Sequence, residues 1–248
     1  MNVQVWVVSG IMKLLAITMR TGLTQMTRFT YFAQPIENIA TKRVILYELL
    51  LREWDEKRSA WRVPSSFELP PSQVVQLLAE AVKELDNHHV SINLTRAQFA
   101  DENMMHQLTN FVRQYLSPRQ LTVELVECPD LEVLKRLSAG YRSAGVLLAI
   151  DDVGSDNQFK QVQHLLPYVN TIKFALQNMR KRGEQPSPEC IAALKFWFDQ
   201  AEEQQMLFTF EGIETPADVA LAQRFRITRG QGYYFSRPHD PQEFHVSA

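Results

Sequence analysis

Two patterns of hydrophobic and polar positions alternate along the chain from residue 29 onward. Short apolar runs rich in β-branched and aromatic residues are followed by longer segments with an apolar residue every three or four positions. The first pattern is typical of buried strands and the second of amphipathic helices. The predicted strands are Phe29–Gln34, Arg43–Leu51, His89–Leu94, Leu121–Val126, Val146–Ile150, Val169–Phe174, Met206–Phe210 and Gly232–Phe235. The predicted helices are Pro71–Leu85, Glu102–Leu116, Leu131–Ser143, Gln158–Leu165, Pro188–Gln204 and Pro216–Phe225.

This alternation predicts an α/β fold in which parallel strands are joined by right-handed crossovers. The number of strands favours a TIM-like eight-stranded (β/α) barrel formed by residues 29–248. An open, doubly wound sheet is the alternative, and it would usually carry a GxGxxG turn after its first strand. The only close pair of glycines, Gly230 and Gly232, lies late in the chain. We therefore expect the closed barrel.

Residues 1–28 are expected to be an N-terminal extension outside the barrel. The stretch 3–17 is largely apolar but too short and interrupted for a confident membrane span. It also lacks the charged start and the cleavage site of a signal peptide. Three interpretations stay open: a loosely attached amphipathic helix, an anchor at a membrane surface, or an untranslated stretch followed by a start at Met26. We favour the first or the last.

The composition narrows the class of partner. The net charge of the 248 residues is −2, which argues against a general nucleic-acid binder and hence against a DNA partner. Cys128 and Cys190 lie far apart and form no CxxC pair. Two reduced thiols of this kind are typical of a cytoplasmic protein.

Polar residues stand near the carboxyl ends of the predicted strands, where a barrel of this type carries its chemistry. They are Glu48, Asn93, Glu124, Glu127, Asp151, Asp152, Lys173, Glu211, Glu214 and Gln231. Carboxylates gathered in one place need a cation, because each loses hydration and repels the others. Oxygen ligands without Cys or His favour Mg²⁺ or Mn²⁺. A residue such as Asp151 could bridge two ions, and Lys173 could hold an attacking water.

Each of these residues also has an ordinary explanation. A glutamate in Val-Glu-Leu usually lies at a solvated strand edge, an Asp-Asp pair before glycine is usually a turn, and a lysine within a strand usually points outward. The spacing alone leaves a metal site and these ordinary positions equally open.

The chain from about residue 30 to 240 resembles the EAL domains that degrade the cyclic dinucleotide c-di-GMP. The segments that carry the resemblance are Phe32-Ala-Gln-Pro-Ile36, Glu48-Leu-Leu-Leu-Arg52, Ile92-Asn-Leu-Thr95, Glu124-Leu-Val-Glu127, Asp151-Asp-Val-Gly154, Ile172-Lys173, Glu211-Gly-Ile-Glu214 and Gln231-Gly-Tyr-Tyr-Phe-Ser-Arg-Pro238. Each is weak alone, whereas their common order along the chain is specific.

The resemblance implies a metal-dependent phosphodiesterase that opens c-di-GMP to linear pGpG. It assigns the metal ligands Glu48, Asn93, Glu124 and Asp151, with Asp152 on a second ion. It makes Glu211 the general base and Lys173 the residue that orients the water. It places Gln34, Leu51, Arg52 and Gln231 at the substrate, with Arg52 on a phosphate and Gln231 also supporting the metal ligands. Behind them, Glu127 would brace the loop after Asp152, and Glu214 would be an outer supporting residue.

Two departures from the family pattern affect the expected activity. The loop Val153–Gln158 replaces residues that organise the second metal and the dimer contact in relatives, and Ala175 replaces an aspartate. Three functions therefore stay open: a hydrolase with weak turnover, a c-di-GMP sensor without turnover, and a regulator of a protein partner. The family's dimer contact also makes a homodimer an expectation.

Overall fold

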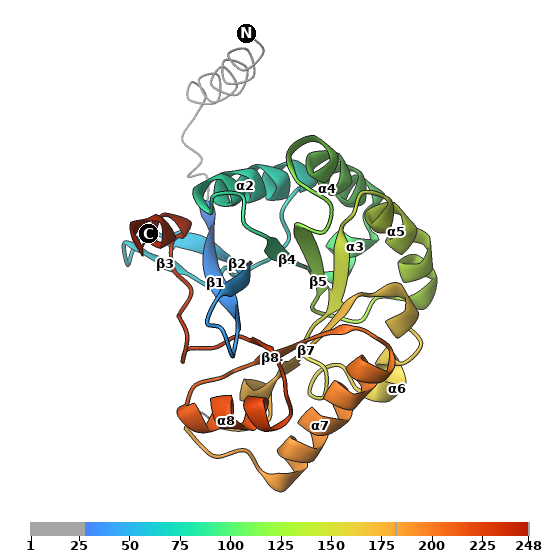
Figure 1. Cartoon of the computed structure of the whole chain (residues 1–248). Helices are drawn as coiled ribbons and strands as arrows, with labels where there is room; N and C mark the ends of the chain where they lie inside the picture. The colour runs from blue at the N-terminus through green and yellow to red at the C-terminus, as the bar shows by residue number, and fades with distance from the viewer. Residues whose placement is uncertain (1–27, 182, 248) are drawn as a thin grey trace, which may run out of the picture.

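Strand pairing closes a ring. In the computed structural model, which describes residues 28–181 and 183–247, one sheet of nine strands has the order β1-β9-β8-β7-β6-β5-β4-β2-β3, and β1 also pairs with β2. The strands are β1 (Phe29–Asn38), β2 (Val44–Asp55), β3 (Ala60–Arg62), β4 (Val90–Leu94), β5 (Leu121–Leu125), β6 (Leu147–Ile150), β7 (Thr171–Ala175), β8 (Leu207–Glu211) and β9 (Arg229–Gly230). Because β3 pairs only at the outer edge of β2, eight strands form the barrel (Figure 1), which confirms the predicted fold.

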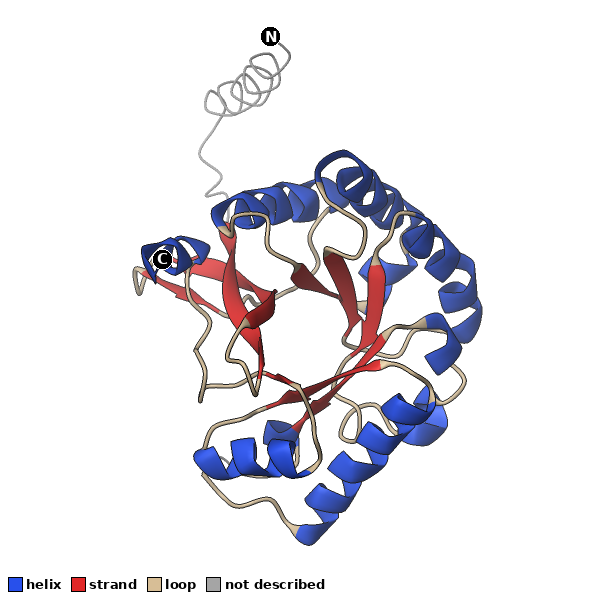
Figure 2. Ribbon diagram, in the orientation of Figure 1, coloured by secondary structure: helices blue, strands red, loops and turns tan. Residues whose placement is uncertain are grey.

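Helices surround the ring of strands (Figure 2). They are α2 (Pro71–Glu84), α3 (Arg96–Ala100), α4 (Glu102–Tyr115), α5 (Leu131–Ser143), α6 (Phe159–Val162), α7 (Pro188–Glu203) and α8 (Pro216–Arg224), with 3-10 turns η2 (Leu166–Tyr168), η3 (Leu176–Asn178) and η4 (Pro241–Ser247). Each long helix buries an apolar stripe against the barrel, as α2 does with Val74, Leu78 and Ala81. The main core therefore lies between the sheet and the helices.

Local signals explain where several helices begin. The side chain of Thr215 accepts a hydrogen bond from the Asp218 backbone, and Pro216 follows at the first helical position, as the sequence predicts. Asp130 caps α5 and Ser187 caps α7 in the same way. The predicted helix at 158–165 is shorter than expected, because only Phe159–Val162 is α-helical.

The expectation that all barrel strands are parallel is wrong for the first strand. β1 runs antiparallel to both β2 and β9. The two strands β1 and β2 form a hairpin, in which the Asn38 side chain accepts hydrogen bonds from the backbone of Ala40 and Thr41 at 3.1 and 2.9 Å. Lys42 completes the turn with a positive φ of 59°.

The prediction of a last strand at Gly232–Phe235 is also wrong. This segment is a turn, and the eighth strand of the barrel is β9, which lies just before it. Gly232 lies against the backbone of Ile213, where a Cβ would approach the Ile213 carbonyl oxygen to 2.1 Å. The Ile213 carbonyl accepts the Tyr234 N–H at 2.9 Å, and the Gly232 carbonyl accepts the Phe235 N–H at 3.0 Å. These contacts outweigh the strand preference of the aromatic residues.

In the described part of the chain, no helix has the length and apolar character needed to cross a membrane. The predictions for residues 1–27 lie outside the described residues.

Candidate metal centre

The carboxyl ends of the barrel strands bring the predicted ligands together. Asn93 on β4 lies beside Glu124 on β5, and Gln34 on β1 lies beside Glu48 on β2. Alternate residues of a strand share one face, so the residues that precede or follow these ligands by one position point out toward the helices. The barrel mouth thus collects one polar side chain from nearly every strand.

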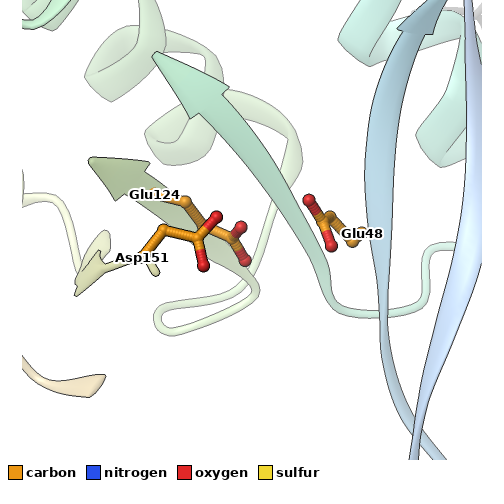
Figure 3. A group of neighbouring side chains, drawn as sticks. All are labelled: Glu48, Glu124 and Asp151. Atoms are coloured by element: carbon orange, nitrogen blue, oxygen red, sulfur yellow. The ribbon is translucent and has the colours of Figure 1, made fainter. Parts of the chain in front are cut away.

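The first group of ligands contains Glu48, Glu124 and Asp151. All three are buried, and each offers a carboxylate oxygen within 4.8 Å of the others (Figure 3). The Asn93 amide donates to Glu48 Oε1 at 2.7 Å, and Asn93 Oδ1 is buried with no hydrogen-bond partner. A buried acceptor without a donor is costly, so this oxygen is suited to a cation. The geometry agrees with the predicted convergence of all four side chains.

A second group contains Asp151, Asp152 and Glu211, whose carboxylate oxygens again lie within 4.8 Å of one another. Asp151 belongs to both groups. Asp152 has a positive φ of 50° at the tight turn that follows β6, which directs it toward this group rather than along the strand. A carboxylate shared by two clusters is the arrangement expected of a bridge between two ions.

Lys173 lies among these acids and is 1% exposed. Its Nζ is 2.6 Å from Glu124 and 2.7 Å from Glu211. It is also 3.4 Å from Glu48 and 3.5 Å from Asp151. Lys173, which is predicted to orient a water molecule, therefore contacts three predicted metal ligands and the predicted general base.

The electrostatics of this cluster favour an added cation. Five carboxylates, Glu48, Glu124, Asp151, Asp152 and Glu211, surround one lysine, which leaves a formal excess of four negative charges. Burial, together with the repulsion of Asp151, raises the pKa of Glu124 to about 8 and that of Asp152 to about 7.

Burial also raises the pKa of Glu211 well above its usual value. Burial acts in the same direction on Glu48, but the charge of Lys173 and hydrogen bonds from Asn93 and Gln231 outweigh it, so the pKa of Glu48 is lowered. Without a cation the cluster thus favours bound protons, and a divalent ion would replace them. Hard oxygen ligands and the unpartnered Asn93 Oδ1 fit Mg²⁺ or Mn²⁺.

Gln34 and Gln231 support the first group from one side. Gln231 Nε2 donates to Glu48 Oε2 at 2.7 Å and to Gln34 Oε1 at 3.2 Å. Gln34 in turn donates to the Ser236 carbonyl at 2.9 Å. Because β9 ends at Gly230, Gln231 follows the end of its strand, as Asp151 follows β6.

The loop after Asp152 is held by residues to which the sequence analysis gave no part in the site. The buried Asn157 amide donates to the Asp151 carbonyl at 2.6 Å, and the Cys128 thiol contacts Asn157 Oδ1 at 2.9 Å. Asn178 donates to Asp152 Oδ1 at 2.8 Å. Asn157 lies within the loop that departs from the family pattern, which is the signal that could have identified it.

The resemblance implies that Glu127 braces the loop after Asp152, and in this structure Asn157 is the residue that contacts the Asp151 carbonyl. The Glu127 side chain is 64% exposed and lies 3.8 Å from Arg96. β5 ends at Leu125, and Glu127 lies in the bend that follows it. The supporting role that the resemblance implies for Glu127 therefore stays a prediction.

The loop that follows Glu211 is fixed by a buried ion pair. Arg180 and Asp218 form two hydrogen bonds of 2.7 Å, and Arg180 also donates to the Gly212 carbonyl at 3.3 Å. Half-buried Glu214 donates its backbone N–H to Asp218 at 3.0 Å. The loop with Glu214, the predicted outer supporting residue, is thus joined through Asp218 to Arg180 in the segment after β7.

A cavity of about 480 Å³ adjoins the acidic cluster. Its polar wall contains Glu48, Asn93 and Asp151, and its apolar wall includes Leu51, Val63, Phe67 and Val126. Arg52 also lines it, with one guanidinium nitrogen donating to the Leu51 carbonyl at 2.9 Å. The predicted substrate residues Leu51 and Arg52 therefore flank the metal ligands in one cavity.

Comparison with known proteins places this site in a family. The model of the EAL domain matches residues 18–238. The chain belongs to the EAL domain family. One similar protein, from Escherichia coli K12, is described as the probable cyclic di-GMP phosphodiesterase PdeB. It is 23% identical over 235 residues, which are 85% of this chain and 43% of that protein. The oxygen sensor protein DosP of the same organism is 25% identical over 76% of this chain and 26% of its own length. This chain thus spans less than half the length of these two relatives.

Solved structures share the fold at low identity. An EAL domain protein from Listeria monocytogenes has a TM-score of 0.71 and 20% identity, with 88% of this chain and 91% of that chain covered. The Bacillus subtilis YkuI protein, solved with c-di-GMP and calcium, has a TM-score of 0.70 and 19% identity, with 86% of this chain and 56% of that chain covered. These likenesses support the barrel fold.

Proposed function

We propose that this EAL domain is a metal-dependent phosphodiesterase that hydrolyses c-di-GMP to linear pGpG. The observation that carries the proposal is the pair of carboxylate groups that share Asp151, in which every carboxylate is buried except the half-buried Asp152. The relatives PdeB and YkuI support the choice of substrate, because their descriptions name cyclic di-GMP phosphodiesterase activity and bound c-di-GMP.

The two groups would hold Mg²⁺ or Mn²⁺, with Glu48, Asn93, Glu124 and Asp151 as ligands of one ion and Asp152 as a ligand of the second. Bound there, the metal supplies Lewis-acid polarisation of the phosphate and lowers the pKa of water. Glu211 accepts the proton of the attacking water, because its carboxylate belongs to the second group and lies beside Lys173. Lys173, 2.7 Å from Glu211, positions that water and offsets charge on the phosphate.

The bond changes balance without a further reactant. The water oxygen forms a bond to one phosphorus atom, and the bond from that phosphorus to a ribose 3′ oxygen breaks. The leaving oxygen takes up a proton, which opens the ring to a 5′-phosphorylated linear dinucleotide. Arg52 would bind a phosphate, and the apolar wall with Phe67 and Val126 would cover a base.

A c-di-GMP sensor is the second candidate. It is favoured by Ala175, which is buried beside Glu211 where an aspartate could orient Lys173 or a bound water. Both candidates keep the nucleotide as the ligand and differ in whether it is hydrolysed.

The test compares Glu124→Gln with Glu132→Gln, since Glu132 is an exposed residue on α5 paired with Lys135. Purified proteins are incubated with c-di-GMP and Mn²⁺, and the products are separated by chromatography. We expect pGpG from wild type and from Glu132→Gln, and none from Glu124→Gln. Binding of c-di-GMP without product from wild type in either metal would support the sensor instead.

A further inference from the structure

Asp152 is held differently from the other carboxylates of the metal centre. The four buried carboxylates each lie near Lys173 Nζ, at distances from 2.6 to 3.5 Å. Asp152 is half-buried, and the ion pairs of Lys173 among residues 28–181 and 183–247 do not include it. A metal ligand binds well only when another group fixes its direction. The carboxylate of Asp152 therefore needs a donor other than the lysine.

Backbone contacts fix the turn that carries Asp152 without fixing its side chain. The Asp152 N–H donates to Asp151 Oδ1 at 2.9 Å, and the Val153 N–H donates to the Lys173 carbonyl at 3.0 Å. The turn is thus tied to β7, with a positive φ of 50° at Asp152. These contacts leave rotation about the side-chain bonds of Asp152 open. A side-chain partner must therefore decide where its carboxylate points.

Asn178 is that partner. It lies in η3, directly after β7, and its Nδ2 donates to Asp152 Oδ1 at 2.8 Å and to Ser155 Oγ at 3.3 Å. Ser155 Oγ in turn donates to the Asp152 carbonyl at 3.2 Å. Asn178 thus holds both the carboxylate of Asp152 and the hydroxyl that braces the turn after β6.

An amide is a suitable donor for a residue that binds a cation. It is uncharged, so it orients the carboxylate without neutralising it and without repelling a metal ion. A hydrogen bond on Asp152 Oδ1 leaves the second carboxylate oxygen available as a ligand. The Asp152 carboxylate already lies within 4.8 Å of those of Asp151 and Glu211. Asn178 therefore acts on a ligand that is in place for the second ion.

We propose that Asn178 is a positioning residue that directs the carboxylate of Asp152 toward the second metal ion. The proposal rests on the metal site of the proposed function. Without the amide, the half-buried Asp152 side chain can rotate away from the second group. The first ion keeps all four of its ligands in that case. Loss of such an orienting partner weakens metal binding by about 10–100-fold, so the loss should fall on the second ion.

The test measures Mn²⁺ binding by calorimetry for wild type, Asn178→Ala, Asp152→Ala and the double variant. Asn178 is exposed, so its truncation leaves no cavity in the core. Gln76→Ala is the control, because the exposed Gln76 amide also donates to a carboxylate, that of Glu80 on the outer helix α2, at 3.1 Å. If Asn178→Ala does not fold, Asn178→Leu replaces it with the same expected results.

We expect wild type and Gln76→Ala to bind two Mn²⁺ ions alike. Asn178→Ala should bind the second ion about 10–100-fold more weakly, with the affinity for the first ion near that of wild type. The isotherms of Asp152→Ala and the double variant should coincide, because Asn178 acts through Asp152. In EDTA the melting temperature of Asn178→Ala should stay within about 4 °C of wild type, since it loses one exposed interaction.

Three results would overturn this role: an unchanged affinity for the second ion, an equal loss for both ions, or a further change in the double variant. A fall of more than about 4 °C in EDTA would give Asn178 a general structural role instead. A wild type that binds no Mn²⁺ would refute both the proposed function and the role of Asn178, and one that binds a single ion would refute the role of Asn178. Two bound ions with the expected loss, but no pGpG from wild type, would refute hydrolysis and leave the role of Asn178 standing.

Discussion

Removing Arg180 is expected to destabilise the protein through one buried carboxylate. Asp218 is fully buried and accepts two hydrogen bonds of 2.7 Å from Arg180. It also accepts three from the segment before α8, namely the Glu214 N–H at 3.0 Å, the Thr215 N–H at 2.9 Å and the Thr215 hydroxyl at 3.0 Å. Arg180→Met leaves this carboxylate buried without its counter-charge.

The magnitude follows from the geometry. Breaking a buried pair by removing one partner costs about 3–5 kcal/mol, and the three remaining hydrogen bonds place the expected value near the lower end. In a chain of this size each kcal/mol shifts the melting temperature by about 2–4 °C. Arg180→Met should therefore lower the melting temperature by about 6–12 °C. The Gly212 carbonyl loses a donor in the same variant, so the loop that carries Glu211 should loosen.

The assay is thermal unfolding followed by circular dichroism, with Lys195→Met as the control. Lys195 and Asp199 form an exposed pair one helical turn apart, with side chains 56% and 54% exposed. Such pairs contribute at most about 1 kcal/mol, so the control should change little. A loss in Arg180→Met as small as that in Lys195→Met would refute the structural role of the buried pair.

The pH dependence has a defined sign. Burial raises the pKa of Asp218, but hydrogen bonds from Arg180, from the Glu214 backbone and from Thr215 outweigh it and hold the pKa below its usual value. The stabilisation is therefore complete above the ordinary carboxyl pKa of about 3.9 and is lost as pH falls through the lower folded pKa. The difference between wild type and Arg180→Met should shrink below about pH 3.9. A difference that stays constant to the acid limit would contradict this assignment.

Three further predictions concern the metal centre. Glu48→Ala should abolish the rise in melting temperature that wild type shows on addition of Mn²⁺, a rise worth about 2.7 kcal/mol at a metal concentration of 100 times the dissociation constant; an undiminished rise would exclude Glu48 as a ligand. Lys173→Ala should reduce kcat for c-di-GMP much more than it weakens nucleotide binding, measured by steady-state kinetics and calorimetry, because the lysine acts on the water and the transition state; equal losses would exclude that role. Ala175→Asp should raise turnover in Mg²⁺ toward the rate in Mn²⁺, because an aspartate beside Glu211 restores an orienting partner worth about 10–100-fold; a wild type already fast in Mg²⁺ and slowed by the substitution would show that the family departures are neutral.

The sequence predicts the barrel and the gathering of ligands for one physical reason. Parallel strands end on the same side of the barrel, so Glu124 and Asp151, which end successive strands, must be neighbours. What it does not predict depends on contacts between distant segments. The turn at Gly232 is imposed by the Ile213 backbone, and β1 reverses because of a hairpin that the alternating pattern does not distinguish from a crossover.

The sequence also does not predict which side chains outside the strand ends contact one another. Asn157 reaches back to the Asp151 carbonyl from within a loop, and Arg180 reaches Asp218 across 38 residues. No local pattern links such residues, because the fold alone determines which loops meet.

The most direct test of the account is hydrolysis of c-di-GMP in water labelled with ¹⁸O, with Mn²⁺ present and the product analysed by mass spectrometry. The account predicts pGpG that carries one ¹⁸O atom in its terminal phosphate, with product formation abolished by EDTA. Recovery of intact c-di-GMP from a protein that binds both Mn²⁺ and the nucleotide would contradict the central claim that this acidic cluster activates water for attack on phosphorus.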